Sequence, residues 1–225
     1  MKMKVSSIFF AITLACAATA ASTANAAGVT WANLTSWNSS NQLVSGNIGS
    51  ITVTMKGNGD QIFTQYSNSI WTPTSTYVSS FGNGPSGADI IGLNSAGTET
   101  ITFSQSVKNP LIALMSWNDS VVSFGNDPIK ILNMGGSSCC WGAGSIVLNA
   151  AGTGFNGIYE ANGVIEVLGT YKTITFTDKT NEYWHGYTVG ITPTPEPEEW
   201  AMMLLGFGMV GFQVKRKKAA WFKAG

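Results

Sequence analysis

The feature that most constrains the fold of this chain is a repeating alternation of apolar and polar residues. The alternation runs through residues 51–55, 100–103 and 173–177, and Gly, Asn or Asp lies close to each segment. A period of two places alternate side chains on opposite faces of a β-strand, so each segment predicts a strand with one buried face. Continuous apolar runs at 111–115 and 163–168 predict more central strands.

Turn signals divide the strand segments. Asn83-Gly84 and Asn162-Gly163 are typical of tight turns, and no amphipathic helix is evident between Gly28 and Ile191. About ten short strands at roughly 8–12-residue spacing predict an all-β fold, a two-sheet β-sandwich or jelly roll. We expect one exported domain over residues 27–191, ending in a hairpin of segments 171–176 and 183–191.

A second constraint lies at the end of the chain. No charged residue occurs from Trp200 to Val214, and the basic cluster Lys215, Arg216, Lys217 and Lys218 follows directly. A helix without a polar face suits a protein core or a bilayer. The position between a Pro-rich linker (192–199) and a basic tail (215–225) favours a single transmembrane helix over 200–214. About 22 Å of helix is short for a bilayer core of about 30 Å, which fits a temporary anchor. The basic residues place the tail in the cytoplasm and everything before the span outside.

The C-terminal segment has three parts in a fixed order: Pro195-Glu196-Pro197, a short Gly-interrupted apolar helix, and the basic cluster. This arrangement, from about Thr194 to Lys218, resembles the PEP-CTERM sorting signal of Gram-negative bacteria. The resemblance implies recognition by exosortase, a membrane protease-transpeptidase, with cleavage close to Pro195, Glu196 and Pro197. Thr194 and Gln213 depart slightly from the family pattern, and an ordinary C-terminal membrane anchor is the alternative.

The start of the chain predicts export. Lys2 and Lys4 precede an apolar run over 5–18, and the small residues of Ala24-Asn25-Ala26 follow. This is the order of a secretory signal peptide (1–26), cut after Ala26 and passed through the secretion translocon. Cys16 would suit a lipoprotein signal, but Thr13 stands where such signals usually have Leu.

Charge and cysteine content narrow the function of the exported domain. It carries nine acidic residues, five lysines and no arginine. Nucleic acid is therefore an unsuitable partner, because phosphate contacts need clustered basic side chains. Two neighbouring cysteines, Cys139 and Cys140, remain after signal removal. They could form a vicinal disulfide, bridge two molecules or stay free, but they cannot join distant segments.

The candidate sites in this domain are a sugar-binding site, a calcium site and a catalytic site. Trp141, Tyr183 and Trp184 lie beside Gly-rich or polar turn residues and are candidates for stacking on sugars, although most aromatic rings fill cores. No cofactor is expected. Asn58-Gly59-Asp60, Asn118-Asp119 and Asn126-Asp127 could supply oxygens to a structural Ca²⁺, although Asn and Asp also form turns by default.

Catalysis has little support in the sequence, and no metal ligand set is expected. His185 is the single imidazole, and Gly-x-Ser-x-Gly and cysteine-protease motifs are missing. Carboxylate pairs such as Glu160 with Glu166 are not distinguished from surface residues. We therefore expect a non-enzymatic protein with a structural or adhesive role. It would be held transiently in the inner membrane and then delivered to the cell surface or matrix. The resemblance implies a link to exopolysaccharide and biofilm. The alternatives are a jelly-roll carbohydrate-binding module and, third, a secreted hydrolase.

Overall fold

The computed structural model describes residues 28–57, 61–65, 70–78, 82–85, 87, 89–135, 142–193 and 204–208, with only the backbone of 61–65. Fourteen strands and three short helical segments, the last over 204–208, occur in these residues, and every strand pair is antiparallel. The expected all-β fold is confirmed at the level of two antiparallel sheets with few helices.

The first sheet, called the open sheet here, begins at β2 (Asn33–Asn38) and continues through β3 (Leu43–Ile48), β4 (Ile51–Gly57), β7 (Gly97–Lys108) and β13 (Thr170–Asp178) to β9 (Val121–Ser123). The first half of β12 (Gly154–Val167) follows β9, and β11 (Gly144–Leu148) pairs with that half. A 3-10 turn (Ser39–Asn41) joins β2 to β3. Along β4, β7 and β13 buried residues alternate with more exposed ones, as the period-two pattern predicted.

The second sheet, called the covered sheet, begins at β10 (Ile129–Gly135) and includes the second half of β12. It continues through β8 (Leu111–Asn118), β14 (His185–Ile191), β6 (Asp89–Leu93) and β5 (Gln61–Gln65). The two-residue β1 (Thr30–Trp31) pairs with the end of β14. Nearly every residue of β8 and β14 is buried, which agrees with the central position that the run 111–115 predicted.

The two sheets pack face to face over one large core. Phe176 of β13 and Tyr187 of β14 meet edge to face with ring centroids 5.4 Å apart, and Trp117 of β8 contacts Phe155 of β12 at 5.7 Å. A smaller apolar cluster lies on the other face of the covered sheet, where Trp71 and Tyr77 pack with residues that include Leu111 and Val164. Tyr77 ends α1 (Thr74–Tyr77), a single helical turn. The covered sheet is therefore buried on both faces.

Two expectations about connections are wrong. Asn162-Gly163 does not form a turn, because both residues lie inside β12, where the register against β8 shifts. β12 pairs with strands of the open sheet up to Tyr159 and with β8 of the covered sheet from Glu160 onward. A Cβ on Gly163 would lie 2.3 Å from the backbone oxygen of Asn133, so close strand packing accounts for the glycine.

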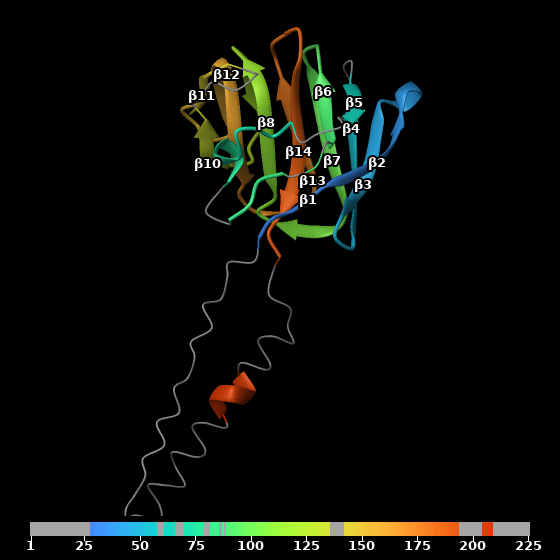
Figure 1. Ribbon diagram of the computed structural model, residues 1–225, viewed down its shortest axis with the longest axis vertical. Coiled ribbons are helices and arrows are strands. Elements are labelled where there is room, and N and C mark those ends of the chain that lie inside the picture. Colours follow the sequence, from blue (N-terminus) through green and yellow to red (C-terminus); the bar gives the residue numbers. More distant parts are fainter. Residues whose placement is uncertain are drawn as a thin grey trace, which may run out of the picture.

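The expected last hairpin is also wrong. β13 pairs with β7 and β9, whereas β14 pairs with β8, β6 and β1. The segment 179–184 therefore crosses from one sheet to the other. In Figure 1 β11 and β12 lie at one side of the domain and β2 and β3 at the other, and the chain enters before β1 beside its exit after β14.

The predicted signal peptide and most of the predicted transmembrane segment 200–214 lie outside the described residues. Residues 204–208 are helical, with Leu204, Leu205 and Phe207 exposed. Within the described part of the chain, no helix combines the length and the hydrophobicity that a membrane crossing needs.

Candidate functional site

A cluster of ionisable side chains lies where the chain crosses between the sheets. Asp178 ends β13, Glu182 lies in the crossing segment, and His185 begins β14. The His185 side chain is fully buried, that of Asp178 is 2% exposed and that of Glu182 is 10% exposed. Ring atom Nδ1 lies 2.7 Å from Oε1 of Glu182, and Nε2 lies 3.2 Å from Oδ2 of Asp178. Both are ion pairs by distance, although their angles are poor for hydrogen bonds.

The carboxylates of this cluster also hold backbone. Glu182 accepts a hydrogen bond from the Asn118 N–H (3.0 Å) and another from the Ser120 hydroxyl (2.9 Å). Asp178 accepts one from the Thr180 N–H at 3.0 Å. The cluster thus fastens the crossing segment to the turn between β8 and β9.

A second buried pair extends the cluster into the core. Glu99 of β7 is 2% exposed, and its Oε2 accepts a hydrogen bond from the Tyr187 hydroxyl at 3.2 Å. Glu99 and Asp178 come from the open sheet, and His185 and Tyr187 come from the covered sheet. The four residues form a polar seam between two otherwise apolar layers.

The seam changes the protonation of its members. Burial raises the pKa of Glu99 to about 7, although the Tyr187 hydrogen bond and the charge of His185 oppose the rise. Burial alone would lower the pKa of His185, but its contacts with Asp178 and Glu182 and their negative charges raise it above its ordinary value. The two carboxylates therefore favour the charged form of the imidazole that lies between them.

The side chains of Asp178, Glu182 and His185 are also a candidate set of metal ligands. Their ligand atoms lie within 4.8 Å of one another. However, each ring nitrogen already lies at ion-pair distance from a carboxylate oxygen, Nδ1 from Glu182 and Nε2 from Asp178. Both oxygens of Glu182 already accept hydrogen bonds. The arrangement suits a proton on His185 better than a metal ion.

The described residues among those expected to bind sugar or calcium do not form one site. Tyr183 is 98% exposed, whereas the neighbouring Trp184 packs partly buried against the cluster around Trp71. Trp141, Cys139 and Cys140 lie outside the described residues, as do Asn58-Gly59-Asp60, the sorting motif Pro195-Glu196-Pro197, the span ends Trp200 and Val214, and the basic cluster 215–218. Asp119 and Asp127 lie in separate turns, and Asp119 accepts a hydrogen bond from the Tyr159 N–H at 3.3 Å.

The outer face of the open sheet, called the hydroxyl face here, carries hydroxyl groups on directly paired residues of neighbouring strands. One row of directly paired residues crosses five strands, and it consists of Ser36, Ser45, Thr54, Thr102 and Thr173. On the next two rows Thr100 pairs with Thr175 and Thr98 with Thr177, and the hydroxyl oxygens of these pairs lie 3.5 and 3.0 Å apart. The face is therefore polar and contains few charges, such as Lys56.

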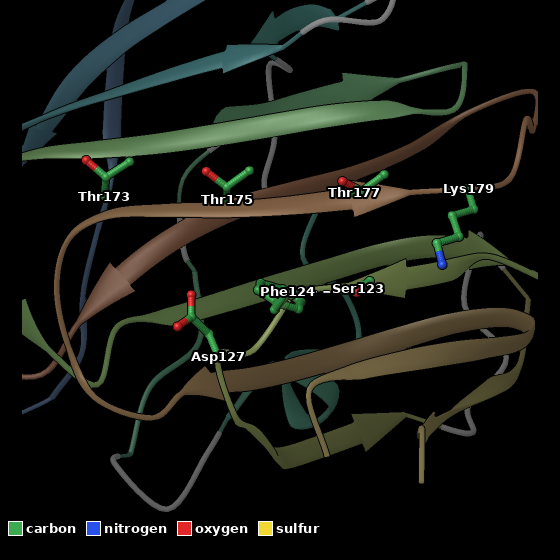
Figure 2. Close-up of a pocket in the computed structure, with 8 residues that line it drawn as sticks. Ser123, Phe124, Asp127, Thr173, Thr175, Thr177 and Lys179 are labelled. Carbon is green, nitrogen blue, oxygen red and sulfur yellow. Dashed lines mark hydrogen bonds between the residues drawn. The ribbon is translucent and has the colours of Figure 1, made fainter. Parts of the chain in front are cut away.

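A hollow of about 400 Å³ lies at the edge of this face (Figure 2). One wall is the outer side of β13, and the other is the turn between β9 and β10. The lining residues are Ser123, Phe124, Gly125, Asp127, Thr173, Thr175, Thr177 and Lys179. Hydroxyl, carboxylate and ammonium groups thus share one concave surface that is open to solvent.

Neither the seam nor the hydroxyl face is among the predicted sites, although the strand pattern contains a signal for each. Glu99 and Asp178 fall in phase with Ile101 and Phe176, the inward residues of β7 and β13. A carboxylate at a core position needs a buried partner, and the single histidine was the available one. The threonines fall in the opposite phase, on the solvent side.

Comparison with known proteins finds no match for this chain among protein-family models, curated proteins or solved structures.

Proposed function

We propose that this chain is an exported, non-enzymatic protein of the bacterial surface or extracellular matrix, and that its open sheet is an adhesive surface. The observation that carries the proposal is the contrast in accessibility between two polar regions. His185 is enclosed by carboxylates in the core, whereas the accessible hydroxyl face offers hydrogen bonds without strong charge. Such a face suits contact with neutral, hydrated polymers of a matrix.

The positions of the two ends of the domain are consistent with an accessible hydroxyl face. Thr30 pairs with Ile191, so the segments before β1 and after β14 leave the domain at the same end (Figure 1). In the proposal, the N-terminal segment is a signal peptide removed after Ala26. The C-terminal segment is a transient anchor over 200–214 with Lys215–Lys218 in the cytoplasm. Exosortase would recognise Pro195, Glu196 and Pro197 and release the domain. A membrane at that end leaves the hydroxyl face free.

Deletion of every residue after Thr194 tests the sorting part of the proposal. In a Gram-negative host with an exosortase, the wild-type protein should reach the surface or matrix fraction. Its intact mass should lack residues 1–26 and the tail. The deletion variant should be absent from that fraction. A chain lacking only residues 219–225 is the matched control and should behave as the wild type. Equal destinations and masses for wild type and the Thr194 deletion would refute exosortase sorting.

A carbohydrate-binding module of jelly-roll type is the second candidate function. The hollow beside β13 favours it, because hydroxyl, carboxylate and ammonium groups share one concave surface there.

A further inference from the structure

We propose that the hollow between β13 and the β9–β10 turn binds one unit of a saccharide through its neighbouring hydroxyl groups. The inference rests on the adhesive function proposed above and deepens it by assigning a ligand class and its residues. It differs from the sugar site expected from the sequence, which relied on Trp141, Tyr183 and Trp184.

The hollow exists because β9 is short. It pairs with β13 only at Thr177 and Asp178, and the chain then leaves the open sheet at Phe124 to begin β10 of the covered sheet. The part of β13 before Thr177 therefore has β7 on one side and the hollow on the other. Figure 2 shows Thr173, Thr175 and Thr177 in a row along β13, with Asp127 and Phe124 across from them.

The wall that carries Asp127 is held in place by backbone hydrogen bonds. Gly125 has a φ of +67°, and the Asp127 N–H donates to the Phe124 carbonyl at 3.1 Å, which closes a tight turn. The residues on either side of this turn are fixed as well. The Phe124 N–H donates to Thr153 O, the Ile129 N–H donates to Gly152 O, and Pro128 O accepts from the Leu168 N–H, each at 2.8 Å. A wall fixed in this way is pre-organised, which reduces the ordering cost of binding.

The chemistry of the lining selects the ligand class. Each threonine hydroxyl both donates and accepts hydrogen bonds, the Asp127 carboxylate only accepts, and the Lys179 ammonium only donates. Neighbouring hydroxyls of a sugar ring can donate together to a carboxylate while they accept from the threonines and the lysine. A phosphate or another strong anion suits the hollow poorly, because it would face Asp127. Hydrogen bonds to charged groups are the stronger ones, so Asp127 and Lys179 should each contribute more than any one threonine.

The hydroxyl rows extend the hollow into a longer surface. Thr173, at the edge of the hollow, begins the row that continues through Thr102 and Thr54 to Ser45. Adjacent strands lie about 4.8 Å apart, so Thr54 is about 10 Å from Thr173. A single sugar in the hollow cannot reach Thr54, whereas a chain of several units can. Longer saccharides should therefore bind more tightly than single sugars.

The experiment titrates the full chain, purified in a detergent without a sugar headgroup, with glucose, galactose, mannose and N-acetylglucosamine and their soluble oligosaccharides. Binding is measured by calorimetry. We expect saturable binding of at least one series. Asp127→Asn should weaken it about tenfold and Thr175→Val several-fold. Thr54→Val is the matched control on the same face, and it should leave the binding of single sugars unchanged while weakening that of the oligosaccharide.

Two results would overturn the proposal. One is the lack of saturable binding across the panel, and the other is binding that Asp127→Asn and Thr175→Val leave unchanged. Both variants keep the size of the side chain, and their unfolding transitions are recorded beside the wild type. Failure of sugar binding with normal delivery to the matrix would refute the saccharide site alone. Loss of the wild type from the surface and matrix would refute the proposed function.

Discussion

The outer faces of the two sheets differ in what covers them. On the covered sheet, Trp71, Tyr77 and Val29 pack over β8 and neighbouring strands, and β8 is buried along seven of its eight residues. On the open sheet, the outer residues of β4, β7 and β13 are mostly threonines in contact with solvent. The two sheets share one core but differ in what their outer faces contribute. The covered sheet contributes a second apolar cluster to stability, and the open sheet leaves a polar surface available for binding.

The difference is visible in the sequence because it changes the strand pattern. A strand buried on both faces needs apolar residues throughout, as in 111–115, whereas a strand with one wet face alternates, as in 173–177. The covering residues themselves are harder to recognise. Trp71 lies between Ile70 and Thr72 in a segment without a regular hydrophobic pattern. It covers the sheet only through contacts with strands that are distant in the sequence.

Removing the cover should have the largest effect. Trp71 is fully buried, and its ring meets that of Tyr77 edge to face at 5.1 Å. Trp71→Ala should lower the free energy of unfolding by about 3–5 kcal/mol, since it leaves a large cavity over the covered sheet. Urea denaturation measures the change. Tyr183→Ala removes an aromatic ring that is 98% exposed and should cost less than about 0.5 kcal/mol. Equally small losses of unfolding free energy for the two variants would show that packing over the outer face of the covered sheet does not contribute to stability.

The polar seam should have the second largest effect on stability, since it joins the two sheets. His185→Asn leaves the buried Asp178 and the nearly buried Glu182 without their cation. A buried carboxylate that loses its partner is strongly destabilising, so we expect a loss of about 3–4 kcal/mol at pH 6, measured by urea denaturation. Lys179→Gln, an exposed change in the same crossing segment, is the control. A loss below about 1 kcal/mol would mean that the charges of the seam are not needed to hold the crossing.

Glu99 should make the stability of the seam depend on pH. Its pKa is raised from 4.5 to about 7 in the folded protein, so between these values the folded state binds more protons than the unfolded state. Stability from this group is present at low pH and is lost as pH rises through about 7. The raised pKa of His185 acts in the same direction, with its contribution lost as pH rises through the folded pKa.

Glu99→Gln isolates this effect, because glutamine keeps the shape but does not titrate. The unfolding free energy of the wild type relative to the variant should fall by about 3 kcal/mol between pH 4 and pH 8. Chemical denaturation at several pH values measures the difference. Asp89→Asn, at the start of β6, is the control and should leave most of the pH dependence in place. Parallel curves for wild type and Glu99→Gln would contradict the raised pKa.

The sequence predicted the class of fold better than the connections or the site. Alternation in β4, β7 and β13 and the apolar run in β8 follow from burial alone, which is a local property of each strand. Whether Asn162-Gly163 turns or continues depends on neighbouring strands, and here close packing of Gly163 against Asn133 makes it continue. The path of segment 179–184 also depends on neighbouring strands, because its local sequence is equally compatible with a hairpin between β13 and β14. Asp178, Glu182 and His185 become one cluster only because the segment crosses between sheets.

The smallest effect on stability is expected at the hydroxyl face of the open sheet. The hydroxyl oxygens of Thr98 and Thr177 lie 3.0 Å apart on paired strands of the open sheet. A part-buried cross-strand pair of this kind should contribute only about 0.5 kcal/mol, so Thr98→Val and Thr177→Val should each change stability little. A double-mutant cycle of the two, measured by urea denaturation, should give a coupling of about that size. Thr54→Val with Thr177→Val, two residues that are not paired, is the control cycle and should give no coupling. A coupling well above 1 kcal/mol would mean that this face is built for stability, and its hydroxyls would then be less free for a ligand.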